Sequence, residues 1–521
     1  MPPLLFHGGR IHVGDGTSAE ALVAEAGTVR AIGRRADLAR DHPDAERVDL
    51  RGGLMTAGWQ DAHVHFMWWA IQMRQLDLRD CATLEDALAR IAAYARPLPR
   101  DAWVLGGRFD KNRWGRWPTA AELDGVTDGR PSALRSRDGH SWWLNTPALR
   151  AARIAATTPD PAGGAIERDA HGAPTGILKE NANHLVDEVV PPPSADDCFA
   201  AIALGQTEAH RRGLTAIEDL EEVDAFAAFQ RRHERGELRL RVHMGIPHGS
   251  LDAALALGLR TGLGDPWLSV GHLKVFTDGA LGSQTAALEE PYEGTSDRGL
   301  LTIEPERLDR DVMRAAGGGI AVAIHAIGDR AVRVALDAIA ATRRVAPGLR
   351  HRIEHAQLIR ESDIERFVAF GVIASMQPIH ATSDRDLADR HWGAARVARA
   401  YPWRRLVQAG ARLAFGSDAP VEPIDPLLGV HAAVARQRPA DREPWHPEQA
   451  LTLDAAIAAY TAGAAYAMGA ERERGTLAPG MRCDATIVDR DLAATPVAEW
   501  PSVHVIGTVV DGAVVHADGL A

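Results

Sequence analysis

Residues 56–66 read TAGWQDAHVHF, a short apolar run that ends in Asp61, His63 and His65. The run predicts a β-strand, in which residues two apart point to the same side. His63 and His65 then project into one space, about 7 Å apart along the backbone. Two neutral imidazoles at this spacing are typical ligands of Zn²⁺ or a similar divalent ion. Taken alone, an HxH pair more often marks two histidines on a solvated strand edge, and its place at the end of an apolar strand is what favours the metal site.

Seven more strand-like runs follow, and helical patterns such as DRAVRVALDAIAATRRV (329–345) separate them. Alternation of this kind predicts parallel βα units. With the first strand the count is eight, which predicts an α/β fold of the (β/α)₈ TIM-barrel type. The seven runs are TAIEDL (215–220), LRLRVHMGI (238–246), GHLKVF (271–276), GIAVAIHAI (319–327), HRIEHA (351–356), VIASMQ (372–377) and RLAFGSD (412–418).

Two strand-like runs, AWVLGG (102–107) and SALRSR (132–137), would raise the count to ten. We therefore interpret about 75–200 as an insertion after the first barrel strand, because this segment is rich in Trp, Gly and Pro. The PPPS at 191–194 is typical of an exit linker. The barrel itself is expected over 58–467.

The two ends of the chain share a sequence pattern that is typical of short strands joined by tight turns. LLFHGGRIHVGDG (4–16) and HVIGTVVDGAVVHADG (504–519) both contain strand runs broken by Gly-rich turns. We expect residues 1–57 and 468–521 to pair into one small β-sandwich domain beside the barrel.

Composition excludes several classes of protein. The 521 residues carry a net charge of −12, which argues against nucleic acid or an anionic membrane as a partner. The three cysteines show no CxxC spacing, so neither a zinc ribbon nor a disulfide framework is expected. No run of about 18 apolar residues and no secretory signal is evident, which leaves the cytoplasm as the expected compartment.

Four of the later strand runs carry a polar candidate ligand: Lys274 lies inside its apolar run, and His325, His355 and Asp418 lie at or near the ends of theirs. Barrel enzymes place their chemistry at the carboxyl ends of the strands, so these side chains are expected to converge with His63 and His65. A buried lysine tends to lose its charge. The neutral amine of Lys274 could then react with CO₂ to a carbamate that bridges two metals. The alternative for Lys274 is a salt bridge to a neighbouring carboxylate.

Longer phrases of the chain, from about residue 3 to 516, resemble the amidohydrolase superfamily. The closest likeness is to the YtcJ-like branch, the amidohydrolase 3 family, which includes N-substituted formamide deformylases. The phrases that carry the likeness are DAHVHF, DGHSWWLN, HLKVFTDGALGSQTAAL, AIHAIGDRA, RIEHAQ, SMQPIH, AFGSDAPV and YTAGAAYAMG. One departure is Cys483, where the family more often has Ala, and we interpret it as a packed core thiol.

The resemblance implies a barrel, a flanking β-sandwich and a centre of one or two divalent metal ions, with Zn²⁺ expected. It implies that His63 and His65 bind one metal, that His325 and His355 bind the other, and that Lys274 bridges them as a carbamate. Asp418 would bind a metal and move protons. His140, in DGHSWW, would either donate to the substrate carbonyl or be structural. Gln377 and His380 would either line the pocket or be structural.

The expected reaction is cleavage of a non-peptide C–N (amide-type) bond by attack of metal-bound hydroxide on a carbonyl. Asp418 would act as general base and then as general acid. The same site could serve an ester, a lactone or a heterocycle, and a barrel that binds without catalysis is the remaining alternative. A small molecule is the expected partner, and a homodimer is a reasonable expectation for a barrel of this size.

The distribution of tryptophans along the chain indicates which kind of substituent the substrate could carry. Eight of the 13 Trp residues precede residue 150, and five of these lie in the insertion. They could roof the barrel mouth and favour an apolar or aromatic substituent. The alternative is that they form the core of the insertion. No cluster of Arg or Lys marks a required anionic group on the substrate.

Overall fold

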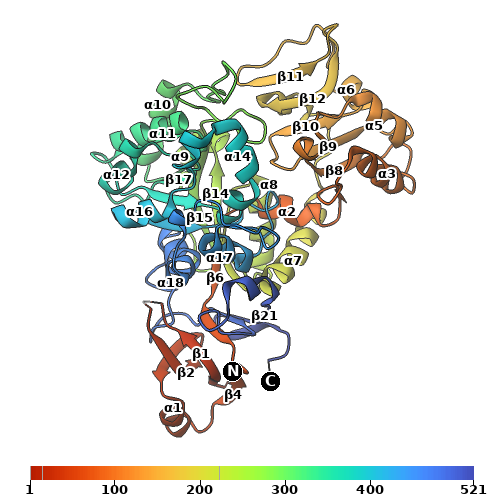
Figure 1. The fold of residues 1–521 in the computed structure, drawn as a ribbon. Helices are drawn as coiled ribbons and strands as arrows, with labels where there is room; N and C mark the ends of the chain where they lie inside the picture. Colours follow the sequence, from red (N-terminus) through yellow and green to blue (C-terminus); the bar gives the residue numbers. More distant parts are fainter. Residues whose placement is uncertain (1, 15, 222, 521) are drawn as a thin grey trace.

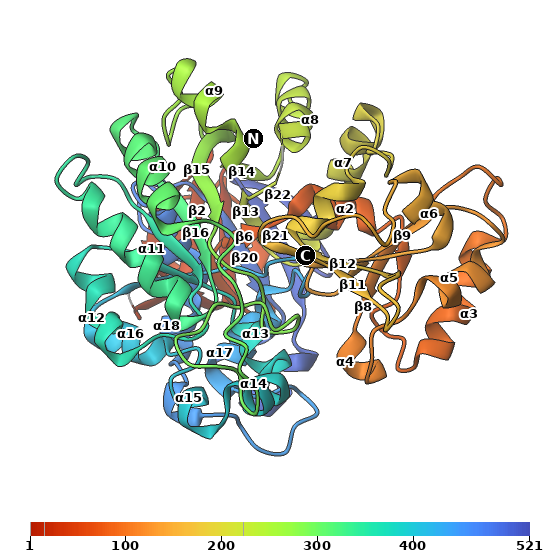
Figure 2. The same ribbon diagram turned by 90° about the horizontal axis from the view of Figure 1, so that it is seen from above.

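We describe the protein from a computed structural model, which covers residues 2–14, 16–221 and 223–520. Among these residues the eight predicted barrel strands form one parallel sheet, in the chain order in which they were predicted. Helices surround the strands, as the view down the barrel shows (Figure 2). The strands are β6 (Trp59–Val64), β13 (Leu214–Asp219), β14 (Arg241–Pro247), β15 (Leu268–Phe276), β16 (Val322–Ala326), β17 (Arg352–His355), β18 (Ile373–Met376) and β19 (Arg412–Phe415).

The sheet closes between the segment that follows β19 and the end of β6. The backbone N–H of Asp418 donates to the carbonyl of His63 at 2.8 Å, and the N–H of His65 donates to the carbonyl of Ala419 at 2.9 Å. Gly416 permits this approach, because a Cβ atom there would lie 2.5 Å from the backbone nitrogen of His63. Barrel closure therefore brings the last predicted ligand next to the first pair.

The helical layer has the amphipathic pattern expected from the sequence. Helix α11 (Asp329–Thr342) buries Val332, Leu336 and Ile339 against the barrel, and its exposed side carries Arg330 and Asp337. The other helices that cover the strands are α7 (Ala195–Arg211), α8 (Val223–Glu234), α9 (Leu251–Ala256), α10 (Pro305–Gly317), α12 (Glu361–Ala369), α16 (Trp403–Ala409) and α17 (Pro426–Ala435). No helix in the part of the chain that the structure describes is both long enough and apolar enough to cross a bilayer.

Strands from the two ends of the chain join in a second sheet at the base of the molecule, where Figure 1 marks both termini. Strand β20 pairs antiparallel with β5 and so connects the two ends. Cys483 is buried in the core beside this sheet, as predicted. The packing of the sheet as a two-layer sandwich stays a prediction. The strands are β1 (Leu4–His12), β2 (Ser18–Glu25), β3 (Thr28–Gly33), β4 (Glu46–Asp49), β5 (Leu54–Ala57), β20 (Ala485–Val488), β21 (Val505–Val510) and β22 (Ala513–Ala517).

A third sheet lies beside the barrel mouth, at the upper right of Figure 1. It contains the two extra runs of the sequence as β8 and β9, and α3 (Leu84–Ala95) and α5 (Ala120–Thr127) pack against each other beside it. Helix α7 starts at Ala195 and packs on α2 (Phe66–Gln72), so the barrel's helical layer resumes inside the range of about 75–200 predicted as insertion. The strands are β7 (Leu76–Asp77), β8 (Val104–Phe109), β9 (Ser132–Ser136), β10 (Ser141–Leu144), β11 (Gly164–Arg168) and β12 (Pro174–Glu180).

The tryptophans of the insertion divide between two roles. Trp143 is fully buried in the insertion core, with Trp114 packed against it at a ring distance of 6.1 Å. Trp117 and Trp142 also reach the cavity at the barrel mouth, together with Trp68 of α2. The insertion thus uses tryptophans in its own core, and two of these also line the cavity, while the preference for an aromatic substrate stays a prediction.

Candidate metal centre

The six predicted ligands converge from five barrel strands. His63 lies near the end of β6 and His65 directly after it. A cavity of about 1170 Å³ opens above them, and its lining includes every one of the six except His63. His63 is fully buried behind that lining. Besides His63 and His65, the predicted ligands are Lys274 in β15, His325 in β16, His355 at the end of β17 and Asp418 after β19.

His63 is at the centre of the cluster. Its Nε2 atom lies 3.3 Å from Oδ1 of Asp418 and 3.5 Å from Nζ of Lys274. Nε2 of His65 lies 3.5 Å from the same Asp418 oxygen. One ligand atom each from His63, His355 and Asp418 fall within 4.8 Å of one another. These separations leave room for an ion between the donors.

The two histidines from β16 and β17 extend the cluster. The rings of His325 and His355 are 4.6 Å apart, and the rings of His355 and His63 are 4.7 Å apart. Nε2 of His325 lies 3.1 Å from the carbonyl of Gly279, which leaves Nδ1 as the nitrogen available to a metal. The two histidines therefore lie side by side at one edge of the cluster.

Two side chains behind the cluster orient its imidazoles. Glu354 accepts a hydrogen bond of 2.6 Å from Nδ1–H of His63, and Gln377 accepts one of 2.8 Å from Nδ1–H of His355. In each ring this leaves Nε2 without a proton and facing the cluster. Carboxylate and carbonyl partners of this kind are typical of metal-binding histidines. Gln377 is thus a positioning residue and is absent from the cavity lining.

Local backbone geometry explains why neighbouring residues can serve one site. His355 and Asp418 both have left-handed backbone, with φ of 69° and 58°. Non-glycine residues rarely adopt this conformation, and it is concentrated at functional sites. At His355 it ends the alternation of β17, so that Glu354 and His355 both reach the barrel interior.

Burial determines the charge of the donors. Burial lowers the pKa of His65 to about 3, and the Lys274 ammonium adds to this effect. Burial likewise holds the pKa of His63, His325 and His355 well below the usual range. Their imidazoles are therefore neutral, which is the form that binds metals.

Burial shifts the pKa values of Asp418 and Lys274 in opposite directions. Burial raises the pKa of Asp418 to about 8, although Lys274 and His140 oppose the shift. Burial also lowers the pKa of Lys274 to about 8, against the pull of Glu354 and Asp418. Among the described residues no carboxylate lies within 4.0 Å of Nζ of Lys274. The salt-bridge alternative for this lysine is therefore not what the structure shows.

Asp61 ties the first and last strands together behind the ligands. Its carboxylate accepts hydrogen bonds from the backbone N–H of His63 at 3.1 Å and of Ser417 at 3.0 Å. The hydroxyl of Ser417 donates to the other carboxylate oxygen. The Asp of the DAHVH phrase is thus a positioning residue that holds His63 and the loop of Asp418 in register.

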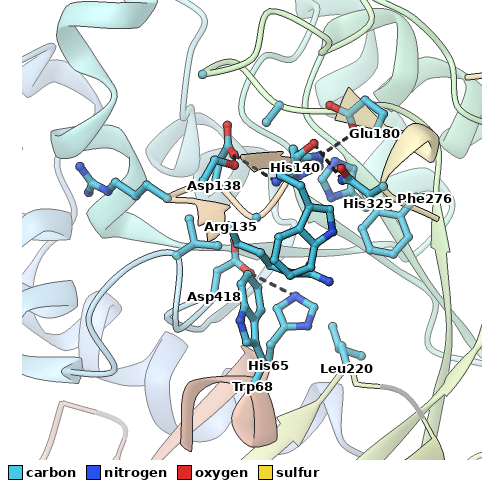
Figure 3. Close-up of a pocket in the computed structure, with 18 of the residues that line it drawn as sticks. His65, Trp68, Arg135, Asp138, His140, Glu180, Leu220, Phe276, His325 and Asp418 are labelled. Atoms are coloured by element: carbon cyan, nitrogen blue, oxygen red, sulfur yellow. Dashed lines mark hydrogen bonds and ion pairs between the residues drawn. The ribbon is translucent and has the colours of Figure 1, made fainter. Parts of the chain in front are cut away.

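His140 reaches the cavity from the insertion, as Figure 3 shows. Its Nδ1 donates to Glu180 at 2.8 Å, and its ring is 5.6 Å from that of His325. Burial alone would lower the pKa of His140, but the Glu180 carboxylate outweighs burial and raises it to about 9. His140 is therefore a cation with a donor directed to a site beside the metal ligands.

His380 lines the cavity beside Asp418, next to the carboxylate oxygen that does not face His63 and His65. Its Nδ1 accepts a hydrogen bond of 3.0 Å from Gln357. Its Nε2–H therefore faces Asp418, 3.4 Å from Oδ2. Of the two residues singled out in SMQPIH, His380 borders the pocket and Gln377 supports a ligand.

A second cluster, Glu218, His243 and His272, lies in the barrel interior and also brings ligand atoms within 4.8 Å of one another. Most of its polar atoms are already engaged, although Nε2 of His243 has no hydrogen-bond partner among the described residues. Glu218 accepts from Nδ1–H of His272 at 2.6 Å and from Arg352. Nε2 of His272 is 3.0 Å from the carbonyl of Arg350. This cluster is a hydrogen-bonded core network, and it does not reach the cavity.

Sequence reasoning missed the supporting carboxylates. Glu354 precedes His355 in the RIEHA run, so its position was a usable signal. No local pattern marks Glu180, which pairs with His140 only through the antiparallel contact of β10 and β12. Glu221 was also missed; its Oε1 lies 3.9 Å from Nδ1 of His65.

A parallel barrel with imidazole, amine and carboxylate donors at its strand ends defines a barrel hydrolase with a candidate metal centre. The chain belongs to the amidohydrolase family, whose family model matches residues 46–516. It is 32% identical to the protein YtcJ of Bacillus subtilis (strain 168) over 98% of this chain and 99% of the relative.

Two further comparisons agree with this membership. The chain is 29% identical to N-substituted formamide deformylase of Arthrobacter pascens over 95% of this chain and 94% of that protein. Among solved structures, an uncharacterized metal-dependent hydrolase from Pyrococcus horikoshii superposes with a TM-score of 0.76 at 30% identity, covering 95% of this chain and 99% of that one.

Proposed function

We propose that the protein is a divalent-metal-dependent hydrolase that cleaves the C–N bond of a small, non-peptide amide. The observation that carries this proposal is the convergence of His63, His355 and Asp418, whose ligand atoms lie within 4.8 Å of one another beside a large cavity. The names of the relatives, a formamide deformylase and a metal-dependent hydrolase, support the same class of reaction.

The residues fit a metal on three counts. The imidazoles are neutral, two of them have hydrogen-bonded partners behind them, and a buried carboxyl with a raised pKa lacks a full counter-charge. Imidazole and carboxylate donors favour Zn²⁺ among the common divalent ions. When bound, the metal supplies Lewis acidity towards a carbonyl and towards water.

Lys274 is proposed to act as a carbamate. Its amine is buried and has no carboxylate partner in the described chain, and its lowered pKa provides the neutral form that reacts with CO₂. The carbamate would add an anionic oxygen ligand between the two pairs of histidines. That charge would help to hold two cations close together.

Asp418 is placed to move the proton. One of its oxygens faces His63 and His65, and the other faces Nε2 of His380 at 3.4 Å. A carboxylate in this position can accept a proton from water and later donate it to the leaving nitrogen. His380 makes no hydrogen bond to this carboxylate, but its Nε2 is the polar atom that borders the second oxygen.

His140 is proposed to bind the substrate carbonyl. Its imidazolium form, held by Glu180, offers a hydrogen bond to the oxygen on which negative charge develops. Trp68, Trp117 and Trp142 supply aromatic surface in the same cavity, which favours a substrate with an apolar or aromatic substituent.

A substrate panel on metal-loaded protein tests the proposal. N-benzyl formamide, acyl amino acids, cyclic imides and small esters would be assayed with Zn²⁺ or Mn²⁺. Hydrolysis of amides with loss of activity on chelation is the expected result. Hydrolysis of the small esters alone would support the same site with a different bond. Protein without metal and without activity would indicate a barrel that binds but does not catalyse.

A further inference from the structure

Arg135 is a cation on the cavity wall that lacks an anionic partner among the described residues. It lies on β9, and its guanidinium carbon is 4.4 Å from the ring centre of Trp142 and 5.2 Å from that of Trp68. No carboxylate of the described chain lies within 4.0 Å of its nitrogens, and its guanidinium donates no hydrogen bond to a described residue. The guanidinium borders the cavity, so its donors are available to a bound molecule.

Several other arginines of the described chain have carboxylate partners, whereas the buried Arg436 and Arg474 have none within 4.0 Å and donate to uncharged oxygens. Arg241 binds Asp484 at 2.6 Å, and Arg137, on the same cavity wall, binds Glu422 at 2.7 Å. Arg135 is half-buried, and its guanidinium keeps five N–H donors and its charge at the cavity wall. Burial lowers the pKa of Arg135, only partly opposed by Glu221 and Asp187. The guanidinium of Arg135 is therefore able to bind an anionic group of a molecule in the cavity.

Neighbouring rings hold this side chain close to the metal centre. Trp142 is the cross-strand neighbour of Arg135 in β10. Trp68 follows His65 by one turn of helix, and the rings of these two residues are 5.8 Å apart. Arg135 is thus separated from a predicted metal ligand by a single indole. Figure 3 shows Arg135, Trp68, His65 and Asp418 on the same side of the cavity.

We propose that Arg135 binds a carboxylate of the substrate, and that the natural substrates are amides with a carboxylate near the scissile bond, as in N-acyl amino acids. This inference rests on the proposed function, since it names the substrate class of the same site. The planar guanidinium can bind a carboxylate through two parallel hydrogen bonds. A sequence without a cluster of basic residues is compatible with this, because one arginine held between two indoles is sufficient.

The cavity lining carries charges of both signs, since Asp138 and Glu221 share it with Lys111 and His140. Arg135 differs from the other arginines of this lining because it has no carboxylate partner within 4.0 Å among the described residues. A substrate carboxylate would supply that partner. An aromatic acyl or amino group would occupy the surface beside Trp68 and Trp142.

A matched pair of substrates tests the carboxylate. N-formylphenylalanine and N-formyl-2-phenylethylamine differ only in that group. For the metal-loaded wild type, we expect kcat/KM to be higher for the acid. Arg135→Gln should lower kcat/KM for the acid by about 10- to 100-fold and leave the neutral substrate nearly unchanged. Arg135→Lys, which keeps the charge but not the paired hydrogen bonds, should fall between them.

Binding without turnover gives a second readout. Calorimetric titration of metal-loaded protein with 3-phenylpropanoate and with 3-phenylpropanamide should show tighter binding of the acid. Arg135→Gln should abolish that preference. Lys111→Gln, which removes another cation of the same cavity wall, should retain it. A merely structural Arg135 would lower the melting temperature without changing the ratio of the two affinities. If Arg135→Gln is unfolded, Arg135→Lys carries the same comparison.

The outcomes separate this inference from the proposed function. Equal preference for the acid in wild type and Arg135→Gln would overturn the inference, since the carboxylate would then bind elsewhere, for example at the metal. Loss of the preference in Lys111→Gln alone would also overturn it. Hydrolysis of both formamides without an effect of Arg135 would leave the amide function intact. Arg135-dependent binding of 3-phenylpropanoate without any hydrolysis would support the anion site and contradict the amide function.

Discussion

The imidazole of His63 is bound at Nδ1 by the carboxylate of Glu354 across 2.6 Å, at a position where both side chains are fully buried. Glu354 also receives hydrogen bonds from Arg352 on the same strand, and Arg352 reaches Glu218 on the far side of the barrel. The first histidine of the site is therefore anchored to the barrel core by a chain of charges.

Replacing Glu354 by Gln should weaken metal binding without removing any predicted ligand. The amide can present its NH₂ group to Nδ1 of His63, which would favour the tautomer with a protonated Nε2 facing the metal. We expect the dissociation constant for Zn²⁺ to rise by about 10- to 100-fold, measured in chelator-buffered titrations. Glu471→Gln, which alters an ion pair with Arg350 outside the cavity, is the matched control. Unchanged affinity in Glu354→Gln would refute the orienting role.

Lys274→Met tests the carbamate. The variant removes the amine but keeps an unbranched side chain, and no ion pair is lost because Lys274 has no carboxylate within 4.0 Å in the described residues. We expect loss of bound metal and of activity, while the unfolding free energy of the metal-free protein does not fall. Metal content is measured by atomic emission on purified protein. Near-normal turnover with metal still bound would contradict the bridging role.

His140 predicts an alkaline limit to activity. Its folded pKa of about 9 lies above its ordinary value of 6.5, because Glu180 stabilises the cation. The stabilisation from this pair is therefore fully present below pH 6.5, within the range where Glu180 is ionised, and is lost as pH rises through about 9. We expect kcat/KM to fall over the same range when His140 donates to the substrate. His140→Gln should lower kcat/KM by about 100-fold and remove that limb. A limb that persists in the variant would assign it to another group.

Gly416→Ala tests the closure of the barrel. The new Cβ would meet the His63 backbone nitrogen at 2.5 Å and a carboxylate oxygen of Asp61 at 2.6 Å. We expect a loss of about 1–3 kcal/mol in the free energy of unfolding, with weaker metal binding because the loop of Asp418 must move. Gly348→Ala is the control, since its Cβ would meet nothing within 4 Å. Equal stability of the two variants in urea would show that closure tolerates the extra atom.

Much of the barrel could be predicted because its signals are local. Each strand is an apolar run, and each predicted ligand stands at or near the end of such a run, as Lys274 and His355 do. The four remaining strands of the insertion sheet, such as the two-residue β7, are too short or too mixed in composition to show a pattern.

The supporting residues of the site depend on contacts between distant parts of the chain. Glu354 on β17 meets His63 on β6 only across the closed barrel. Arg135 and Glu180 reach the cavity only through the fold of the insertion. Such contacts have no signature in the spacing of residues, so the ligands were predictable and most of their partners were not; Glu354, next to His355 in the RIEHA run, is the exception.

Anomalous X-ray diffraction from crystals of the Zn²⁺-loaded protein, recorded on both sides of the zinc absorption edge, tests the central claim most directly. The account predicts one or two zinc peaks at about 2.0–2.3 Å from nitrogens of His63, His65, His325 and His355 and from an oxygen of Asp418. Density for a carbamate should extend from Nζ of Lys274. A cluster without a zinc peak in zinc-loaded crystals, or zinc bound instead among Glu218, His243 and His272, would contradict it.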